Sequence, residues 1–443
     1  MSTVGTILDR EAAQLPAGLS KAFGALLASM AMGVGVADAN ESGLAIAAAK
    51  IVTCADEGPA VVNHGVLVVG SDGRIEAVGR ESEVEVPAGY ERVDVGDRWL
   101  APGMIDLHCH VAGRSLFEVN DLNDGVFLAN PGLRASAAVV PGIGSLDRGV
   151  AGGVTSVLYI PGSATNIGGQ GVLLKTGFDR FDDMLIRNPG SMKLAQAGNP
   201  ERWMIRPGRS FMNWNTRFTI RRGLVAADKQ LSGDPLDGIE HSNPQWEVFE
   251  SLLTKETQVS AHTQVYQVVL NTIMIIKREL GVDVYIDHGT IGGWKTGGIA
   301  AENGVPAICG PRAIDTISRG FQRVTRATVP GFRGVAAGYQ ELGHPNVGFN
   351  TDSPIVPQEE LSLQAAVGAR YGFRDESLQT VRGLTIVPAK AAGIDHRVGS
   401  LEVGKDADIL VVTGHPVDPR TAIERVWIEG REVYNSVEGE RTW

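Results

Sequence analysis

Two histidines spaced two residues apart, His108 and His110, close an apolar run that follows a Pro102-Gly103 turn. Successive side chains of a β-strand point to opposite faces, so both imidazoles would leave the same side of the strand while Cys109 faces away. Two imidazoles on one side of a rigid strand supply half of a metal site. The same spacing also occurs by chance, with one histidine satisfied in the core, so the metal hypothesis depends on further ligands.

Further ligand candidates end other predicted strands. If these strands are parallel in a closed barrel, their carboxyl ends meet on one rim. Neutral imidazoles bind divalent ions without cancelling their charge, and a carboxylate adds affinity and can move protons. Two ions close together can share a hydroxide that is a strong nucleophile at neutral pH. The predicted metal ligands are His108, His110, Lys175, His262, His288 and Asp352.

Each of these downstream candidates also has a structural explanation. His262 could be a buried, hydrogen-bonded histidine, and His288 could form a pair with its neighbour Asp287. Asp352 could cap a helix that begins near residue 354. Lys175 could be an exposed turn lysine. The occurrence of all of them at strand ends favours the metal site over these separate explanations.

The middle of the chain alternates apolar strands with helical patterns at 214–231, 246–256 and 267–280. Repeated units of this kind predict an α/β fold with a (β/α)8 TIM-type barrel. A doubly wound open sheet is the alternative, but no Gly-x-Gly-x-x-Gly motif opens a helix after the first strand. Both ends of the chain are rich in short strands and hairpin signals, which predicts a small β-sandwich built from both ends, with the barrel inserted.

The predicted organisation has four segments. They are an accessory or signal-like segment 1–43, the first part of the sandwich 44–101, the barrel 102–392 and the second part of the sandwich 393–443. Residues 20–39 resemble the apolar core and cleavage site of a signal peptide, although a docked N-terminal helix explains them equally well. The expected localisation is therefore either cytoplasmic or exported, and the stretch is too short and glycine-rich for a membrane span.

Composition narrows the range of partners. The chain has 443 residues with 43% hydrophobic and 21% charged side chains, as expected of a globular protein with a large core. Its formal charge of −11 argues against nucleic acid as a partner. The three cysteines form no Cys-x-x-Cys pair, so neither a thiolate zinc site nor a disulfide framework is expected.

Two motifs carry a family resemblance. The stretch Pro102-Gly-Met-Ile-Asp-Leu-His-Cys-His110 resembles the first-strand signature of the amidohydrolase superfamily. The stretch Ser400-Leu-Glu-Val-Gly-Lys-Asp-Ala-Asp-Ile-Leu410 resembles that family's return into its small sheet domain. The resemblance covers roughly residues 45–435 and is closest to the imidazolonepropionase-like branch. It implies a metal-dependent hydrolase barrel with a sandwich formed by both chain ends.

The resemblance also implies roles for the candidate ligands. His108 and His110 would bind the more buried metal, with Asp352 near it, and His262 and His288 would bind the second. Asp352 would act as general base and then as general acid around a bridging hydroxide. Lys175 would carry a carbamate that bridges two divalent ions, with zinc as the default metal and manganese, iron or cobalt as alternatives. An unmodified Lys175 would imply a single metal.

The expected function is hydrolysis of a C–N bond in an amide, a cyclic amide or a dipeptide. The alternatives are a metal-dependent deaminase, which in this fold usually manages with one metal, and a non-catalytic amidohydrolase-like scaffold. Candidate substrate contacts are Tyr266, Arg312 and Gln170, and the insertion-like stretch 199–217 could form a lid. The expected partner is a small-molecule substrate. The oligomeric state is left open, a homo-oligomer included.

Overall fold

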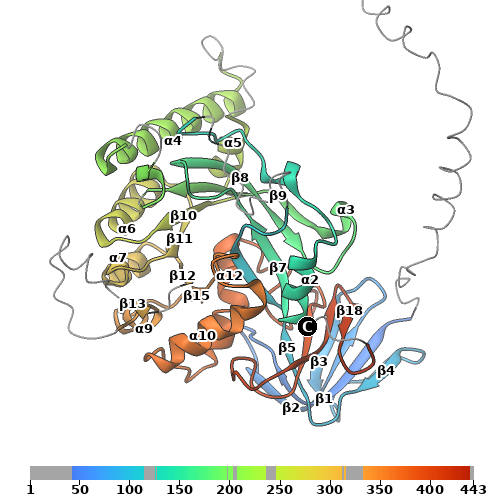
Figure 1. Ribbon diagram of the computed structural model, residues 1–443. Helices are drawn as coiled ribbons and strands as arrows, with labels where there is room; N and C mark the ends of the chain where they lie inside the picture. Colours follow the sequence, from blue (N-terminus) through green and yellow to red (C-terminus); the bar gives the residue numbers. More distant parts are fainter. Residues whose placement is uncertain are drawn as a thin grey trace, which may run out of the picture. The chain divides into compact units, whose positions relative to one another are not determined.

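The computed structural model in Figure 1 has two units, Met1–Ala39 and Asn40–Trp443, and the description below concerns the second. The signal-like stretch 20–39 and Arg312 lie outside the described residues. The structure describes residues 42–113, 125, 127–196, 198–202, 207–235, 246–311, 314–315 and 333–439.

Strands from both ends of the chain form one eight-stranded sheet, in which the blue and red strands of Figure 1 lie side by side. Its order is β18-β17-β16-β5-β1-β2-β3, and β4 pairs with β1. The contact between the two chain ends is the antiparallel pair of β5 and β16. The strands are β1 (Leu44–Val52), β2 (Val61–Val69), β3 (Ile75–Arg80), β4 (Glu91–Asp94), β5 (Trp99–Pro102), β16 (Ile409–Val412), β17 (Ile423–Ile428) and β18 (Arg431–Asn435).

The hairpin signals at the two ends of the chain correspond to two hairpins in this sheet. β2 and β3 pair antiparallel around a turn at residues 70–74, and β17 and β18 pair antiparallel around Glu429 and Gly430. Gly430 adopts a positive φ of 73°, which glycine tolerates without the steric cost of a side chain. A sheet shared by both chain ends is therefore observed, while its closure into a sandwich stays a prediction.

A second sheet has eight strands in the order β15-β12-β11-β10-β9-β8-β7-β6. All residues of β6, β7 and β8 are buried, as expected for strands covered on both faces. A short antiparallel pair, β13 (Ile314–Asp315) with β14 (Arg333–Gly334), lies outside it. The strands of this second sheet are β6 (Met104–Cys109), β7 (Val154–Tyr159), β8 (Ile167–Lys175), β9 (Leu185–Ala195), β10 (Val259–Thr263), β11 (Val284–His288), β12 (Ala307–Cys309) and β15 (Val347–Phe349).

The expected helical stretches are present and slightly displaced. Along α4, Met212, Thr216 and Ile220 are buried at intervals of four residues, so one face of this long helix packs inward. The stretch 267–280 forms α6 and then a π-helical segment, Ile273–Glu279. The helices are α2 (Gly144–Ala151), α3 (Phe181–Met184), α4 (Arg209–Ser232), α5 (Glu247–Leu253), α6 (Tyr266–Thr272), α7 (Gly297–Glu302), α9 (Val335–Glu341), α10 (Leu361–Arg370), α11 (Gln379–Arg382) and α12 (Ile386–Ala392).

The expectation that all barrel strands run in parallel is wrong for β8. This strand pairs antiparallel with both β7 and β9, whereas the other neighbouring pairs of the second sheet are parallel. Only residues 160–166 connect β7 to β8, and a parallel crossover needs a dozen residues or more. The carboxyl end of β8 therefore lies at the opposite rim from the carboxyl ends of its neighbours.

The second sheet is nearly closed by contacts between its first and last strands. Cys109 forms a parallel bridge with Ser353, and the His110 amide donates to the Ser353 carbonyl at 2.9 Å. The Asp106 carboxylate reinforces this closure, because its Oδ2 accepts from Thr351 Oγ1 at 2.5 Å and its Oδ1 accepts from the Thr351 amide at 3.3 Å. The segment after β15 is thereby fixed against β6.

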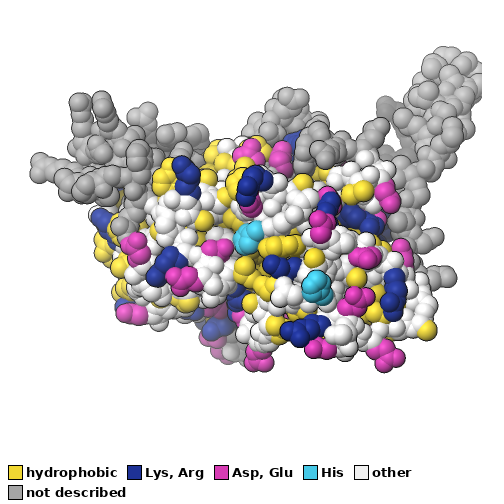
Figure 2. Space-filling model, turned by 90° about the horizontal axis from the view of Figure 1, so that it is seen from below, with side chains coloured by type: hydrophobic (Ala, Val, Ile, Leu, Met, Phe, Trp, Pro, Cys, Tyr) yellow, Lys and Arg dark blue, Asp and Glu magenta, His cyan; other side chains and the backbone are white. Residues whose placement is uncertain are grey.

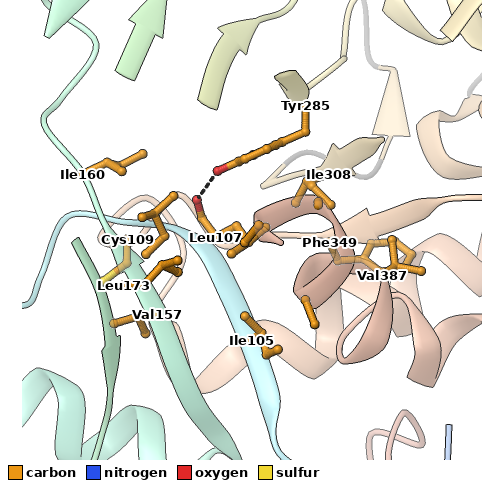
Figure 3. Packing of buried hydrophobic residues seen from close by; sticks show 14 of the residues in the cluster. Ile105, Leu107, Cys109, Val157, Ile160, Leu173, Tyr285, Ile308, Phe349 and Val387 are labelled. Carbon is orange, nitrogen blue, oxygen red and sulfur yellow. Dashed lines mark hydrogen bonds between the residues drawn. The ribbon is translucent and has the colours of Figure 1, made fainter. Parts of the chain in front are cut away.

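Apolar side chains fill the space between this sheet and its covering helices (Figure 3). Leu107, Val157 and Phe349 are fully buried, and burial of one such side chain stabilises the fold by about 1.5–3 kcal/mol. The Tyr285 hydroxyl donates to the Leu107 carbonyl at 3.2 Å, which joins β11 to β6. This packing fixes the strands whose ends carry the candidate ligands.

Lys175, the last residue of β8, lies in a buried ion cluster rather than at the rim with the histidines. Its Nζ is 2.6 Å from Asp408 Oδ2 and 3.1 Å from Asp406 Oδ2. Asp406 also pairs with Arg397 at 2.9 Å. These aspartates precede β16, so the cluster joins the second sheet to the sheet of both chain ends. The placement expected for Lys175 is wrong because β8 runs antiparallel.

The surface and the helices carry two further observations. Basic and acidic side chains are interspersed over the face in Figure 2, so this face presents no field of a single sign. Within the described residues, no helix combines the length and the hydrophobicity that crossing a bilayer requires.

The buried cluster predicts a strong stability effect. In Lys175→Met, Asp408 keeps its buried carboxylate and loses the cation that balances it. We expect a loss of about 3–5 kcal/mol in the free energy of unfolding, measured by urea denaturation. The control is Arg420→Gln, which removes an exposed partner of Asp418 and should leave this free energy unchanged. Equal stability of the two variants would contradict the assigned role of Lys175.

Candidate metal centre

Four histidines and one aspartate converge at one rim of the second sheet. The ring centroids of His108 and His110 are 5.0 Å apart, and those of His262 and His288 are 4.5 Å apart. His108 joins the two pairs, because its ring centroid is 4.6 Å from that of His288. All four histidines are at least 95% buried. The structure thus brings together the histidines that the sequence analysis proposed as ligands.

Asp352 lies between the two histidines of the first strand. Its Oδ1 is 3.3 Å from His108 Nε2 and 3.3 Å from His110 Nε2. His110 Nδ1 lies 2.9 Å from the Ile160 carbonyl, which can only accept a hydrogen bond. Nδ1 therefore carries the proton, and the Nε2 lone pair faces the cluster. This second hydrogen bond on the far side of the ring is typical of metal-binding histidines.

His288 is oriented in the same way. Its Nδ1 lies 2.5 Å from the Gly310 carbonyl, so its Nε2 lone pair also faces inward. That nitrogen is 2.8 Å from His262 Nδ1, which in turn is 2.9 Å from Ser163 Oγ. Imidazole nitrogen atoms of these histidines therefore lie close together in the buried interior of the cluster.

Lys193 is the cation that the sequence analysis missed. It lies on β9, is completely buried, and places its Nζ 2.9 Å from His108 Nε2. β9 is parallel to β10, and Ala195 is level with His262 in the register. The lysine that reaches the histidines is therefore Lys193, and Lys175 stays in its ion cluster at the other end of the sheet.

Asp287 is a second group that the sequence analysis placed differently. It was considered as a partner of its neighbour His288, but its Oδ2 lies 3.1 Å from His108 Nδ1. Both carboxylate oxygens are buried, and neither has a hydrogen-bond partner among the described residues. Burial raises the pKa of Asp287 well above its ordinary value, and the nearby charge of Lys193 opposes this shift.

Burial also sets the protonation of the histidines. Loss of solvent lowers the pKa of His108 and of His262 well below the ordinary value, and the charge of Lys193 adds to both shifts. Burial lowers the pKa of His288 to about 4. Burial alone would raise the pKa of Asp352, but its contact with His110 and the charges of the surrounding side chains, Lys193 among them, outweigh burial and lower the pKa. Neutral imidazoles beside an ionised carboxylate result.

This donor set fits divalent cations. Two groups have ligand atoms within 4.8 Å of one another: His108 with His262 and His288, and His108 with His110 and Asp352. The buried Asp287 oxygens, which have no described hydrogen-bond partner, lie next to His108 and could act as acceptors or ligands for a bound cation. Imidazole and carboxylate ligands of this number suit zinc and neighbouring transition metals.

The backbone at two of these residues is unusual. His288 has φ 72° and Asp352 has φ 50°, in the left-handed region that non-glycine residues seldom adopt. Such conformations cost about 1–3 kcal/mol each and persist when the surrounding structure enforces them. No helix begins at residue 354, because the next helical turn is Gln358–Glu360, so the capping explanation for Asp352 is wrong.

The proposed substrate contacts have different placements. Tyr266 begins α6 and is 37% exposed, directly beyond the strand that ends with His262 and Thr263. Gln170 is buried on β8, where its Nε2 donates to the Pro131 carbonyl at 3.1 Å, which indicates a packing role. Arg312 lies outside the described residues.

A signal for Lys193 was present in the sequence. Ser191-Met-Lys-Leu-Ala195 is an apolar stretch interrupted by one lysine, and charged residues inside buried strands are rare unless they have a partner. The short connections on either side of β8 were the second signal, since they exclude a parallel crossover. Together these signals indicate an antiparallel β8 and a buried, partnered Lys193, and the structure identifies the partner as His108.

Comparisons with known proteins agree with this geometry. A model of the amidohydrolase family matches residues 313–433. The amidohydrolase tasK of Hapsidospora irregularis is 24% identical over 386 residues, which make up 78% of this chain and 37% of that protein. The chain thus spans little more than a third of the length of that relative. An imidazolonepropionase of Brucella anthropi is 23% identical over 392 residues, which cover 82% of this chain and 91% of the relative.

A solved structure extends the likeness to the fold. The crystal structure of an amidohydrolase from Thermotoga maritima aligns with a TM-score of 0.74 at 28% identity, and it covers 88% of this chain and 100% of that one. Given the two sequence motifs, the histidine cluster and these relatives, the chain belongs to the amidohydrolase superfamily and is imidazolonepropionase-like.

Proposed function

We propose that this protein is a metal-dependent hydrolase that cleaves a C–N bond in an amide, a cyclic amide or a dipeptide. The observation that carries the proposal is the convergence of four buried histidines, Asp352 and Lys193 at one rim of the barrel sheet. A non-catalytic scaffold has no need to bury these polar groups in one place. The buried arrangement also costs stability, which favours a functional site.

Two divalent ions would be held by overlapping sets of residues. His108, His110 and Asp352 form one set, and the second contains His262 and His288. Lys193 contacts His108 and pairs in register with Ser260 of β10, two residues before His262. In this proposal it supplies a ligand shared by the two ions. A partly desolvated lysine next to cations gives up its proton readily, and its neutral amine can take up CO2 to become an anionic ligand. In this proposal the carbamate belongs to Lys193.

Bound ions of this kind lower the pKa of water and supply hydroxide at neutral pH. In this reaction Asp352 is the side chain that transfers protons. Its ionised carboxylate accepts the proton that water loses as the new C–O bond forms, and it returns this proton to the nitrogen as the C–N bond breaks. Its partial exposure, 17% of the side chain, leaves it accessible to a substrate while the histidines behind it stay buried.

The relatives support this reaction class. The amidohydrolases of Hapsidospora irregularis and Thermotoga maritima have names that refer to hydrolysis, and a further relative is an imidazolonepropionase of Brucella anthropi. A deaminase remains the alternative, because it would use the same rim with one metal and no lysine ligand. The lysine next to His108 favours the two-metal hydrolase.

The first test removes the proton carrier. Asp352→Asn should lower the rate of amide hydrolysis by a factor of about 10²–10⁴, measured on a panel of dipeptides and cyclic amides. The matched control, Asp395→Asn, changes a partly exposed aspartate on the loop after α12 and should keep full activity. Unchanged hydrolysis by the Asp352 variant would exclude it as the general base.

The second test compares the two lysines. The purified protein should contain about two divalent ions per chain, and Lys193→Met should hold fewer, measured by elemental analysis after purification without chelator. Lys175→Met should keep the metal content of the unchanged protein despite its lower stability, because its ion cluster lies at the other end of β8. The opposite pattern, with metal lost only from the Lys175 variant, would refute the assignment of Lys193. One ion per chain in the unchanged protein would favour the deaminase.

A further inference from the structure

A small polar cavity lies between α4 and α6, at the residue that follows β9. Its volume is about 160 Å³. All but one of the side chains that line it are polar: Gln196, Arg209, Ser210, Asn213, Gln267 and Asn271. Ligand pockets for whole molecules usually measure about 300–1,000 Å³, so this cavity suits one end of a substrate.

One residue that lines the cavity is bonded to the backbone of a candidate metal ligand. Gln196 directly follows β9, and its backbone amide donates to the His262 carbonyl at 3.3 Å. Lys193 lies three residues earlier on the same strand, which corresponds to roughly 10 Å in extended backbone. A substrate that extends from the rim past the end of β9, over a distance on the order of 10 Å or more, would bring its far end to the cavity.

The lining of the cavity is rich in hydrogen-bond donors. Arg209 is the one charged residue among the described side chains that line it. Arg209 is also the first residue of the 24-residue helix α4, whose N-terminus has no side-chain cap in the described structure. The helix N-terminus adds partial positive charge and unpaired N–H groups. Guanidinium, side-chain amides and a helix N-terminus together favour a carboxylate.

Gln196 gives independent support for a ligand at this position. Its side chain is only 4% exposed, and its Oε1 accepts a hydrogen bond from Thr272 Oγ1. Its buried Nε2 has no hydrogen-bond partner among the described residues. An unsatisfied buried amide costs about 1–3 kcal/mol, and an acceptor group on a bound ligand would remove this cost.

Arg209 already forms an ion pair with Glu201. Its Nε donates to Glu201, so one edge of the guanidinium is already engaged. The side chain is 47% exposed, which leaves it accessible to a ligand and weakens each of its ion pairs through solvent screening. The affinity gained from a carboxylate should therefore be moderate, and it should increase when Glu201 is neutralised.

We propose that this cavity binds the carboxylate at the far end of an extended amide substrate, and that Arg209 and Gln196 determine this specificity. The proposal rests on the proposed function and narrows its substrate class. It selects amides that carry a remote anionic group over compact cyclic amides without one.

The test measures binding to the metal-loaded full-length chain by calorimetry, with azelate and its monomethyl ester as probes. One carboxylate of each probe can reach the metal ions, and only azelate presents a second carboxylate to the cavity. We expect azelate to bind about five- to tenfold more tightly than the monoester. In Arg209→Gln the two probes should bind equally, and Gln196→Met should reduce the difference.

Two controls separate this effect from general changes in charge. Arg221→Gln removes another arginine of α4 that does not line the cavity, and it should preserve the difference between the probes. Glu201→Gln should preserve or increase it, because the Arg209 guanidinium is released. Equal binding of both probes to the unchanged protein, or a difference that persists in Arg209→Gln, would overturn the proposal.

A separate assay tests the proposed hydrolase activity. It measures the release of aniline from two kinds of substrate: azelaic monoanilide, which has a remote carboxylate, and neutral anilides, which have none. Hydrolysis of both kinds with equal efficiency would overturn the carboxylate subsite and support the hydrolase. The expected difference in binding without hydrolysis of any amide would support the subsite and count against the hydrolase.

Discussion

The contact between β6 and the segment after β15 is the constraint on which the candidate site depends. Asp106 accepts hydrogen bonds from the Thr351 hydroxyl and backbone amide, and Ser353 pairs with Cys109. These bonds bring the first and last strands of the barrel sheet together. Asp352 lies between the two bonded residues, so closure of the sheet places its carboxylate beside His108 and His110. Without this closure, the ligands would lie at two distant edges of an open sheet.

The candidate site also gathers several polar side chains that are buried from solvent. Burial holds three of the histidines neutral, and it leaves the Asp287 oxygens without described hydrogen-bond partners. A protein core without a bound cation would gain stability from apolar residues at these positions. Two residues also adopt left-handed backbone conformations. These unfavourable features agree with a site whose bound ions compensate for them.

The two buried lysines show how the same residue type has different roles at the two ends of the barrel sheet. Lys175 balances Asp408 where the barrel sheet meets the sheet of both chain ends. Lys193 contacts His108 at the rim that carries the candidate metal centre. Asp406 and Asp408, the two aspartates of the 400–410 motif, therefore have a structural role. Their ion pairs with Lys175 fix the segment that leads into β16 against the barrel sheet. The His-x-His motif, by contrast, supplies two side chains of the candidate metal centre.

The sequence by itself determined the element types, the two hairpins, the joining of both chain ends and the histidines with Asp352. These follow from local patterns, because hydrophobic periodicity, turn residues and strand-end positions are all properties of short stretches. Strand direction is not local, and a strand such as β8 has the same alternation of side chains whether it runs parallel or antiparallel. Only the tertiary structure could therefore pair Lys175 with Asp406 and Asp408, bring Lys193 and Asp287 to His108, and form the polar cavity from the residue after β9 and from residues of α4 and α6.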